Sequence, residues 1–291
     1  MNLYVTPYEL KATLEITTTT YDDLLLRNAE LASEYIDKAA GWRFYPYLRT
    51  RYFDVDDDDP SLVKDGTLYL PEPLLAITSI SISNDDGATY TALAATDYYT
   101  ARGGNYEAYP WTEIILAANG DYSSWYTGQR AVKIIGTWGY REEYATEGWV
   151  LSGDTVIDNP LTAGATTLTV ADTYGLDDRG LTPRFQTGQL LKLESEIVYV
   201  RAVASNTALA IQRAQNGSTA ASHVATTPIY IWRPQELAAN CARIQAARWF
   251  KRAQQAFQDV SAAIEMGQLT YAQELDPDIR SMLKAGLMRL V

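Results

Sequence analysis

The stretch Ala131–Tyr140, AVKIIGTWGY, decides the fold that the sequence predicts. Its first half is rich in β-branched residues, which are typical of a strand. We expect Gly136 to break this strand and Thr137–Tyr140 to turn the chain. Two helices and several strands precede the stretch, and an all-β segment and two more helices follow it. We therefore expect the strand to close one domain, which the chain leaves for an inserted module and rejoins as a long helix.

The N-terminal part predicts two helices. Thr6 is followed by Pro7 and Glu9, the order of a helix cap, a first-turn proline and a capping-box carboxylate, and this helix is expected to end near Glu15. Apolar residues then recur every three or four positions from Asp22 to Ala40, where Gly41 is expected to stop the second helix.

Short strands are expected between this helix and the opening stretch. Pro71 and Pro73 are expected to bracket a turn between two of them, and the NDDG sequence at 84–87 predicts a hairpin turn with a partner strand behind it. The expected strands are Arg49–Val55, Thr67–Leu70, Ile77–Ser83, Asp97–Thr100 and Glu113–Leu116.

After Tyr140 the pattern changes. Arg141–Gly148 is polar and predicts a linker, and the segment from Leu151 to Trp232 shows glycine-punctuated short strands without helical periodicity. We expect a small barrel or sandwich there. Its candidate strands are Thr166–Val170, Leu190–Leu193, Ile197–Val203, Leu209–Gln212 and Ile229–Trp232.

Helical periodicity returns after Pro234. One helix is expected from Glu236 to Ile264, and a last helix over Pro277–Val291. The predicted fold class is α+β: a helical bundle core of two N-terminal and two C-terminal helices with a small β-sheet, plus an inserted all-β module. The expected boundaries are 1–145 with 233–291 for the core and 146–232 for the module.

Composition restricts the function. The net charge of −12 argues against broad sequence-independent contact with nucleic acid, which needs Lys and Arg to neutralise phosphates. Cys241, the one cysteine, is expected to be a buried, inert thiol in a helix. No apolar run approaches the length of a membrane span, and MNLYVTPYEL lacks the regions of a signal peptide, so we expect synthesis in a cytoplasm and no membrane contact.

The sequence offers little catalytic chemistry. His223, the one histidine, is expected on a surface or turn, and the pairs Glu142–Glu143 and Glu194–Glu196 are expected to be exposed charges. The acidic residues at 54, 56 and 58 have the spacing of a calcium loop, but Asp59-Pro60 stands where its turn glycine belongs, which favours a solvated loop. We therefore expect no enzyme activity, no cofactor and no metal.

The order of motifs resembles the head-to-tail connector proteins of tailed bacteriophages, also called head completion or adaptor proteins. The stretches that carry the resemblance are YVTPYELKATLEI, DDLLLRNAELASEYIDKAAGWRF, GTLYLPEPLLAITSISI, NDDG, ATDYYT, AVKIIGTWGY and a C-terminal helix. The resemblance covers about residues 3–140 and 234–291.

The segment between them is similar to a β module of phage structural proteins. There a Glu-x-x-x-Val stretch precedes Arg-Gly-x-x-Gly-Thr-x-x-x-x-His, and here LLKLESEIVYVRAV precedes LAIQRAQNGSTAASHVATTPIYIW. Ala214 stands in place of the first Gly and Ser218 in place of the Thr, so the turn geometry is open at this point. The position of the module predicts an outward decoration or a tail-facing contact.

The resemblance implies a virion protein of the neck, made in the host bacterial cytoplasm. Such adaptors form a ring of about twelve subunits beneath the portal protein, extend the DNA channel and carry the next neck or tail protein, such as a tail terminator or stopper. The expected partners are therefore further copies of the chain, portal, that next protein, and viral DNA that passes without sequence-specific binding.

Basic and apolar residues near the C-terminus are the candidate interface with portal or a neighbouring subunit. The helix over Pro277–Val291 is either a docking arm for portal or a cap on its own bundle, and the basic face of the preceding helix either pairs with a neighbour or is solvated. The candidates are Arg248, Arg252, Arg280, Lys284, Leu287, Arg289, Leu290 and Val291. Trp42, Phe44, Trp138 and Tyr140 are expected in the core, the last two against the returning helix.

Two other classes remain open. One is a tail terminator or another tail or baseplate protein. The other is a glycan-binding virion protein with the aromatic loops Tyr106–Trp111 and Tyr122–Tyr126 as sugar platforms. The two-module interpretation also predicts that removing 146–231 leaves a folded core.

Overall fold

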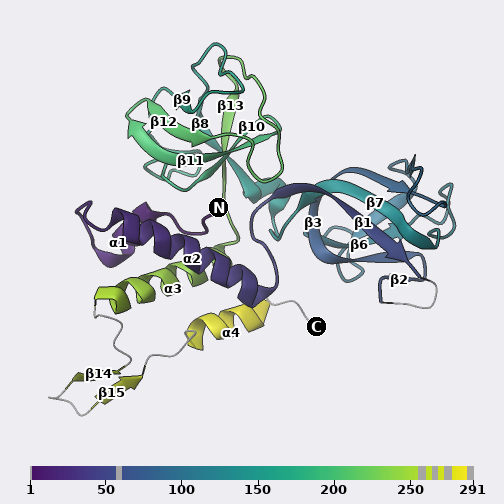
Figure 1. Cartoon of the computed structure of the whole chain (residues 1–291), viewed down its shortest axis with the longest axis horizontal. Helices are drawn as coiled ribbons and strands as arrows, with labels where there is room; N and C mark the ends of the chain where they lie inside the picture. Colours follow the sequence, from purple (N-terminus) through teal and green to yellow (C-terminus); the bar gives the residue numbers. More distant parts are fainter. Residues whose placement is uncertain (1, 57–60, 255–259, 264–267, 272–276, 287–291) are drawn as a thin grey trace.

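The computed structural model describes residues 2–56, 61–254, 260–263, 268–271 and 277–286. As predicted, the fold is α+β, with helices towards both ends of the chain and two antiparallel sheets of seven and six strands. Figure 1 shows the helices, the six-stranded sheet and the seven-stranded sheet as three adjoining bodies. The described α-helices are α1 (Pro7–Leu14), α2 (Asp22–Ala40), α3 (Glu236–Gln254) and α4 (Pro277–Gly286).

The starts and ends of the N-terminal helices are those that the sequence predicts. Thr6 Oγ1 accepts from the Glu9 N–H at 3.2 Å, and Glu9 Oε2 accepts from the Thr6 N–H at 2.8 Å, which completes the capping box. Glu15 caps α1, and Gly41, at a φ of 76°, caps α2 in the left-handed conformation.

The four helices share one hydrophobic core. It joins the N-terminal pair to the C-terminal pair, because α2 and α3 pack side by side and α4 packs on α3. Small residues line both long helices, which lets their axes approach closely. The fully buried members include Leu25, Ala29, Ala32, Ile36, Ala238, Ala242, Ala246, Ile279 and Leu283.

The seven-stranded sheet is larger than the small sheet expected. Its order is β1-β7-β3-β6-β5, with β2 and β4 also paired to β3. The strands are β1 (Tyr47–Val55), β2 (Val63–Lys64), β3 (Thr67–Ile82), β4 (Thr91–Ala92), β5 (Tyr98–Ala101), β6 (Trp111–Leu116) and β7 (Gly128–Trp138). β4 is the partner strand predicted behind the NDDG turn.

The turn expected at Pro71 and Pro73 is wrong, because β3 runs through both prolines. Before them Thr67–Tyr69 pairs with β6, and from Leu74 onward the strand pairs with β7. Prolines lack the N–H that a ladder needs, and here they lie where the strand changes partners and few ladder bonds are required.

The break expected at Gly136 is also wrong. β7 continues to Trp138, and Gly136 stands opposite Ile77 of β3. A Cβ at this position would lie 2.5 Å from the Ala76 carbonyl oxygen, so the glycine permits a close approach of two strands. The chain turns later, at Gly139, whose φ is 142°.

The six-stranded sheet lies between residues 149 and 232 and has the order β8-β13-β10-β11-β12-β9. The sequence predicts five of its strands and misses the first. Its strands are β8 (Trp149–Thr155), β9 (Thr167–Thr169), β10 (Leu190–Leu193), β11 (Glu196–Ser205), β12 (Ala208–Gln212) and β13 (Pro228–Trp232). The expected linker before it holds a π-helical turn, η1 (Tyr144–Gly148), and a buried Arg141.

The chain enters and leaves this sheet at adjacent residues. Trp149 of β8 pairs with Trp232 of β13, and the Arg233 N–H donates to the Gly148 carbonyl oxygen at 2.9 Å. The sheet also touches the rest of the chain elsewhere, because Trp232 Nε1 donates to the Phe44 carbonyl oxygen at 3.3 Å.

The helix expected to reach Ile264 is shorter. α3 ends at Gln254, and beyond it β14 (Val260–Ala263) pairs with β15 (Gln268–Tyr271) in an antiparallel ladder. The expected stop at Met266-Gly267 lies outside the described residues.

Candidate functional site

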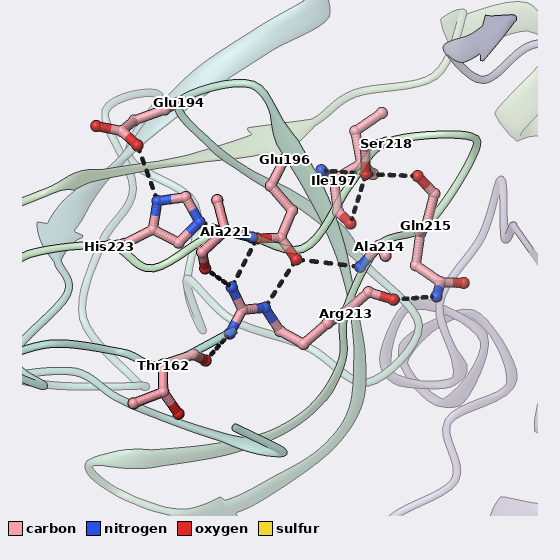
Figure 2. Close-up of polar contacts among 10 residues, drawn as sticks. All are labelled: Thr162, Glu194, Glu196, Ile197, Arg213, Ala214, Gln215, Ser218, Ala221 and His223. Carbon is pink, nitrogen blue, oxygen red and sulfur yellow. Dashed lines mark hydrogen bonds and ion pairs between the residues drawn. The ribbon is translucent and has the colours of Figure 1, made fainter. Parts of the chain in front are cut away.

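A buried carboxylate organises the loop between β12 and β13. Glu196, at the start of β11, is 0% exposed and accepts from Arg213 Nε at 2.7 Å and Nη2 at 2.6 Å. The backbone N–H groups of Ala214 and Ala221 donate to it at 3.0 Å each. Figure 2 shows Glu196 between Arg213 and His223, with both loop segments directed at it.

His223 and Arg213 complete the polar cluster. His223 Nε2 lies 2.9 Å from Glu196 Oε2, and His223 Nδ1 lies 2.9 Å from Glu194 Oε2. The remaining guanidinium N–H groups of Arg213 donate to the carbonyl oxygens of Thr162 and Ala221 at 2.5 Å. Each charged group is therefore matched by partners from the same sheet and its loops.

The electrostatics favour the ionised form of Glu196. Burial alone would raise its pKa, but the hydrogen bonds from Arg213, the Ala221 N–H, His223 and the Ala214 N–H together lower it to about 2. The Ser218 hydroxyl accepts from the Ile197 N–H at 2.9 Å and donates to the Gln215 carbonyl oxygen at 2.8 Å. Its partners are backbone groups, so the arrangement holds a loop in place and does not pair a nucleophile with a base.

Two predictions for this region are wrong. His223 is 1% exposed and not on the surface, and Glu196 is buried, whereas the side chain of Glu194 is 62% exposed as expected. A single histidine does not form a periodic pattern, and the partners of His223 are 27 and 29 residues away in the sequence. The local sequence therefore does not predict that His223 is buried. The signal available in the sequence is an order of residues: Glu196, four positions before Val200, precedes Arg213 and His223.

The backbone of this loop is left-handed at Ala214 and Gly217. Ala214 and Gly217 occupy the two glycine positions of the pattern, and their φ values are 53° and 79°. Left-handed backbone is what glycine tolerates best, so Ala214 keeps the turn at some cost in strain. Ser218 keeps the hydroxyl that the threonine of the pattern supplies.

The predicted interface residues are divided between two helices. Arg248 and Arg252 are half-buried on α3, and Arg280 and Lys284 are exposed on α4. Asn240 Nδ2 lies 3.8 Å from Met282 Sδ, so α4 crosses the first turns of α3, roughly 12 Å along the axis from Arg248. The structure therefore does not bring the two basic pairs together. Leu287, Arg289, Leu290 and Val291 lie outside the described residues.

The apolar face of α4 is covered by the chain's own bundle. Ile279 and Leu283 are buried in the shared helical core, and Met282 packs against it. Among residues 277–284, Arg280 and Lys284 are exposed and face away from this core. Ile279 and Leu283 thus contact the chain's own bundle, while the docking arm expected over Pro277–Val291 stays a prediction, because 287–291 lie outside the described residues.

The four aromatic residues expected in the core belong to two different cores. Phe44 and Tyr140 are buried among the helices with ring centroids 5.6 Å apart, and half-buried Trp42 lies 6.3 Å from Tyr140. Trp138 is buried in the seven-stranded sheet, 6.2 Å from Phe53, and so does not pack against the returning helix. The two residues 138 and 140 thus connect the sheet to the bundle.

Cys241 is buried in the helical core, as predicted, and burial raises the pKa of its thiol to about 11. Asp54 accepts from the Arg130 N–H at 2.7 Å, while Asp58 lies outside the described residues. Within the described part of the chain, no cluster of His, Cys, Asp and Glu could hold a metal ion. None of the described helices is both long and apolar enough to cross a bilayer.

A cleft of about 550 Å³ opens beside the seven-stranded sheet, between β5, the loop before β6 and η1. Its aromatic lining residues are Tyr98, Tyr99, Tyr106, Tyr109, Trp111 and Tyr144. The loop Tyr106–Trp111 therefore faces a cavity, whereas Trp125 of the second aromatic loop is buried and donates to the Gly66 carbonyl oxygen. The side-chain polar groups of the lining are hydroxyls and the indole N–H of Trp111, without the charged or amide groups that orient a sugar.

Comparisons with known proteins give no relative: no family model, no curated protein and no solved structure matches this chain.

Proposed function

We propose that this protein is a structural virion component, the head-to-tail adaptor of a tailed bacteriophage. In this proposal it forms a ring of about twelve subunits beneath the portal, extends the DNA channel and provides the platform for the next neck or tail protein. Its core would be the helical bundle with the seven-stranded sheet, and the six-stranded sheet would be a module inserted into that core.

One observation supports the proposal most strongly. The stretches that resemble the adaptor family are interrupted by about ninety residues that do not share this resemblance. The helices on both sides of the interruption nevertheless pack into a single core. The adjacent entry and exit at Gly148 and Arg233 are what an insertion into an existing domain requires.

The polar cluster supports a structural role as well. Its charges hold the β12–β13 loop, and its one hydroxyl is engaged with backbone. We therefore propose that this cluster stabilises the six-stranded sheet and has no part in catalysis.

The test is the assembly state of the purified protein, alone and with its portal. Mass photometry and negative-stain microscopy should show closed rings of about twelve copies that bind portal. A chain that stays monomeric under both conditions would overturn the adaptor assignment. A ring that binds tail tube and never portal would instead favour a tail terminator.

A further inference from the structure

The chain crosses between the six-stranded sheet and the rest of the molecule at two places that lie side by side. At this crossing the Arg233 N–H donates to the Gly148 carbonyl oxygen at 2.9 Å. Arg179 pairs with Glu147, and Arg233 pairs with Asp177. Each of these ion pairs includes a residue at the crossing, so neither does much to prevent a rotation about it. A few residues where elements end are enough to absorb such a rotation.

The apolar contact between the six-stranded sheet and the rest of the chain is small. Its buried residues are Leu75, Leu190, Ile197 and Trp232, and Trp232 itself stands next to the crossing. Parts of one chain that share only a small apolar contact usually move relative to one another. A fixed orientation of the sheet therefore depends on further contacts.

The N-terminal segment Asn2–Thr6 is anchored in the helical bundle. The side chains of residues 3–5 are buried in the bundle core. The Tyr4 N–H donates to Ser33 Oγ at 2.9 Å, and the Tyr4 hydroxyl donates to Asp37 on the same helix, α2. Figure 1 shows the N-terminus lying where the helices meet the six-stranded sheet.

The same segment also binds the six-stranded sheet. The side-chain amides of Asn2 and Asn216 exchange two hydrogen bonds, at 3.1 and 3.0 Å. The Thr6 hydroxyl donates to Gln186 Oε1 at 2.5 Å. The two ends of the segment thus bind two different loops of the sheet, the loop between β12 and β13 and the loop before β10.

Both loops fit closely against the rest of the chain. Gly188, whose φ is 95°, lies so near Leu3 that a Cβ would overlap the Leu3 side chain. Gly217, whose φ is 79°, lies in the same way against the Leu48 carbonyl oxygen, and the Leu48 N–H donates to the Asn216 carbonyl oxygen at 2.8 Å. Glycine suits positions where φ is positive and another group comes this near.

We propose that Asn2–Thr6 is a strap that fixes the orientation of the six-stranded sheet on the helical bundle. With the strap in place the sheet has one orientation, and with the strap released it rotates about the crossing at Gly148 and Arg233. The buried Glu196 serves the strap, because it holds the loop to which Asn2 binds. This motion takes place within one chain and does not depend on the assembly state of the protein.

The substitution Gly188→Ala tests the strap from the side of the sheet, without a change in the bundle. The added methyl group should displace Leu3 and release the sheet. Gly180→Ala is the matched control in the same loop. Its φ of 78° imposes a similar backbone strain, but a Cβ there would meet nothing within 4 Å.

Spin labels on Leu31→Cys in α2 and Val224→Cys in the sheet measure the orientation by double electron–electron resonance. The two positions are 54% and 64% exposed, whereas Cys241 is buried and stays unlabelled. Labelled protein is diluted with unlabelled protein, so that the distances are those within one chain. We expect one narrow distance distribution for the labelled protein and for Gly180→Ala, and a broad distribution for Gly188→Ala.

Three results of this measurement would overturn the strap. They are a narrow distribution in Gly188→Ala, equal broadening in Gly188→Ala and Gly180→Ala, and a broad distribution in the labelled protein that carries neither substitution. The assembly test of the adaptor assignment is separate, since rings can form with or without a strapped sheet.

Asn216→Gly is a second variant that introduces no steric overlap. It removes the amide pair with Asn2 and keeps the positive φ of 52°, which glycine tolerates. Loss of two hydrogen bonds should make hydrogen exchange of the Leu48 N–H about tenfold faster, while the amides of β10 exchange as in the wild type. Unchanged exchange at Leu48 would contradict the proposal. So would equal acceleration in β10, because it would indicate a loosening of the whole sheet.

Discussion

Glu196 illustrates how one residue fixes a loop of the six-stranded sheet. Its carboxylate receives hydrogen bonds from a guanidinium, an imidazole and two backbone N–H groups, all from the segment that follows β12. Removing one member of a buried ion pair leaves the other desolvated without compensation, which costs more than the pair itself contributes. Substitution of the buried Glu196 should therefore lower the stability more than substitution of Glu194, which lies at the exposed edge of the cluster.

The substitution Glu196→Gln should destabilise the protein by about 3–5 kcal/mol, because Arg213 remains buried without its counter-charge. Chemical denaturation followed by circular dichroism measures this free energy of unfolding. Glu194→Gln is the matched control: its side chain is exposed, and the expected cost is about 0–1 kcal/mol. Equal costs for the two variants would show that the cluster does not hold the loop.

The pH dependence of stability should report the same carboxylate. Folding lowers the pKa of Glu196 from 4.5 to about 2, so its stabilising contribution is complete above pH 4.5 and is lost as the pH falls through 2. The difference in unfolding free energy between wild type and Glu196→Gln should therefore shrink across that window. Asp37, whose pKa burial raises to about 7, titrates at higher pH and is common to both proteins.

At the scale of elements, the pairing of β3 with β7 determines the larger sheet. β3 is long enough to pair with β6 and then with β7, and a Cβ on Gly136 of β7 would lie 2.5 Å from the Ala76 carbonyl oxygen of β3. The two N-terminal helices could be predicted almost to the residue, because their caps and apolar stripes are local signals, whereas the end of α3 was predicted too late. The prolines of β3 and the glycine of β7 are local signals for turns as well, and they mislead here because the partner strands, 40 to 60 residues away, set what those residues do.

Gly136→Ala should test this close approach. The added Cβ would meet the Ala76 carbonyl oxygen and the Leu74 side chain, and backbone cannot move aside as a flexible side chain can. The expected loss of stability is about 1–3 kcal/mol, measured by thermal or chemical unfolding. Gly164→Ala, in a loop where a Cβ has no neighbour within 4 Å, should change stability little. If both variants unfold like the wild type, the strands do not pack as closely as described.

At the scale of the whole molecule, the six-stranded sheet has a core of its own and a smaller set of contacts with the rest of the chain. It has its own buried core, and a smaller cluster of Leu75, Leu190, Ile197 and Trp232 joins it to the rest. The sequence predicts most of its strands from their glycine punctuation. It does not predict this joint, because Leu75 lies in β3 whereas the other three residues lie in the six-stranded sheet, far away in the sequence.

Replacing residues 150–231 with Asn-Gly should leave a folded protein. Trp149 and Trp232 are opposed in an antiparallel pair, so a two-residue turn can connect them. The helical bundle and the seven-stranded sheet keep their own cores. Leu75 loses its partners in the six-stranded sheet and becomes exposed, so the melting temperature should be lower. Circular dichroism and a cooperative melt measure both effects. A shortened chain that lacks a cooperative transition would show that the core depends on the inserted sheet.

The helical bundle can form only after the C-terminal helices have been synthesised. α2 is complete at residue 40, but the face it buries is covered by α3, which begins at residue 236. At about 5–20 residues per second the ribosome needs roughly 10–40 s to make the chain between them. During that interval Leu25, Ala29 and Ile36 have no native partner from α3, so a newly made chain carries an uncovered apolar stripe until both sheets have been translated.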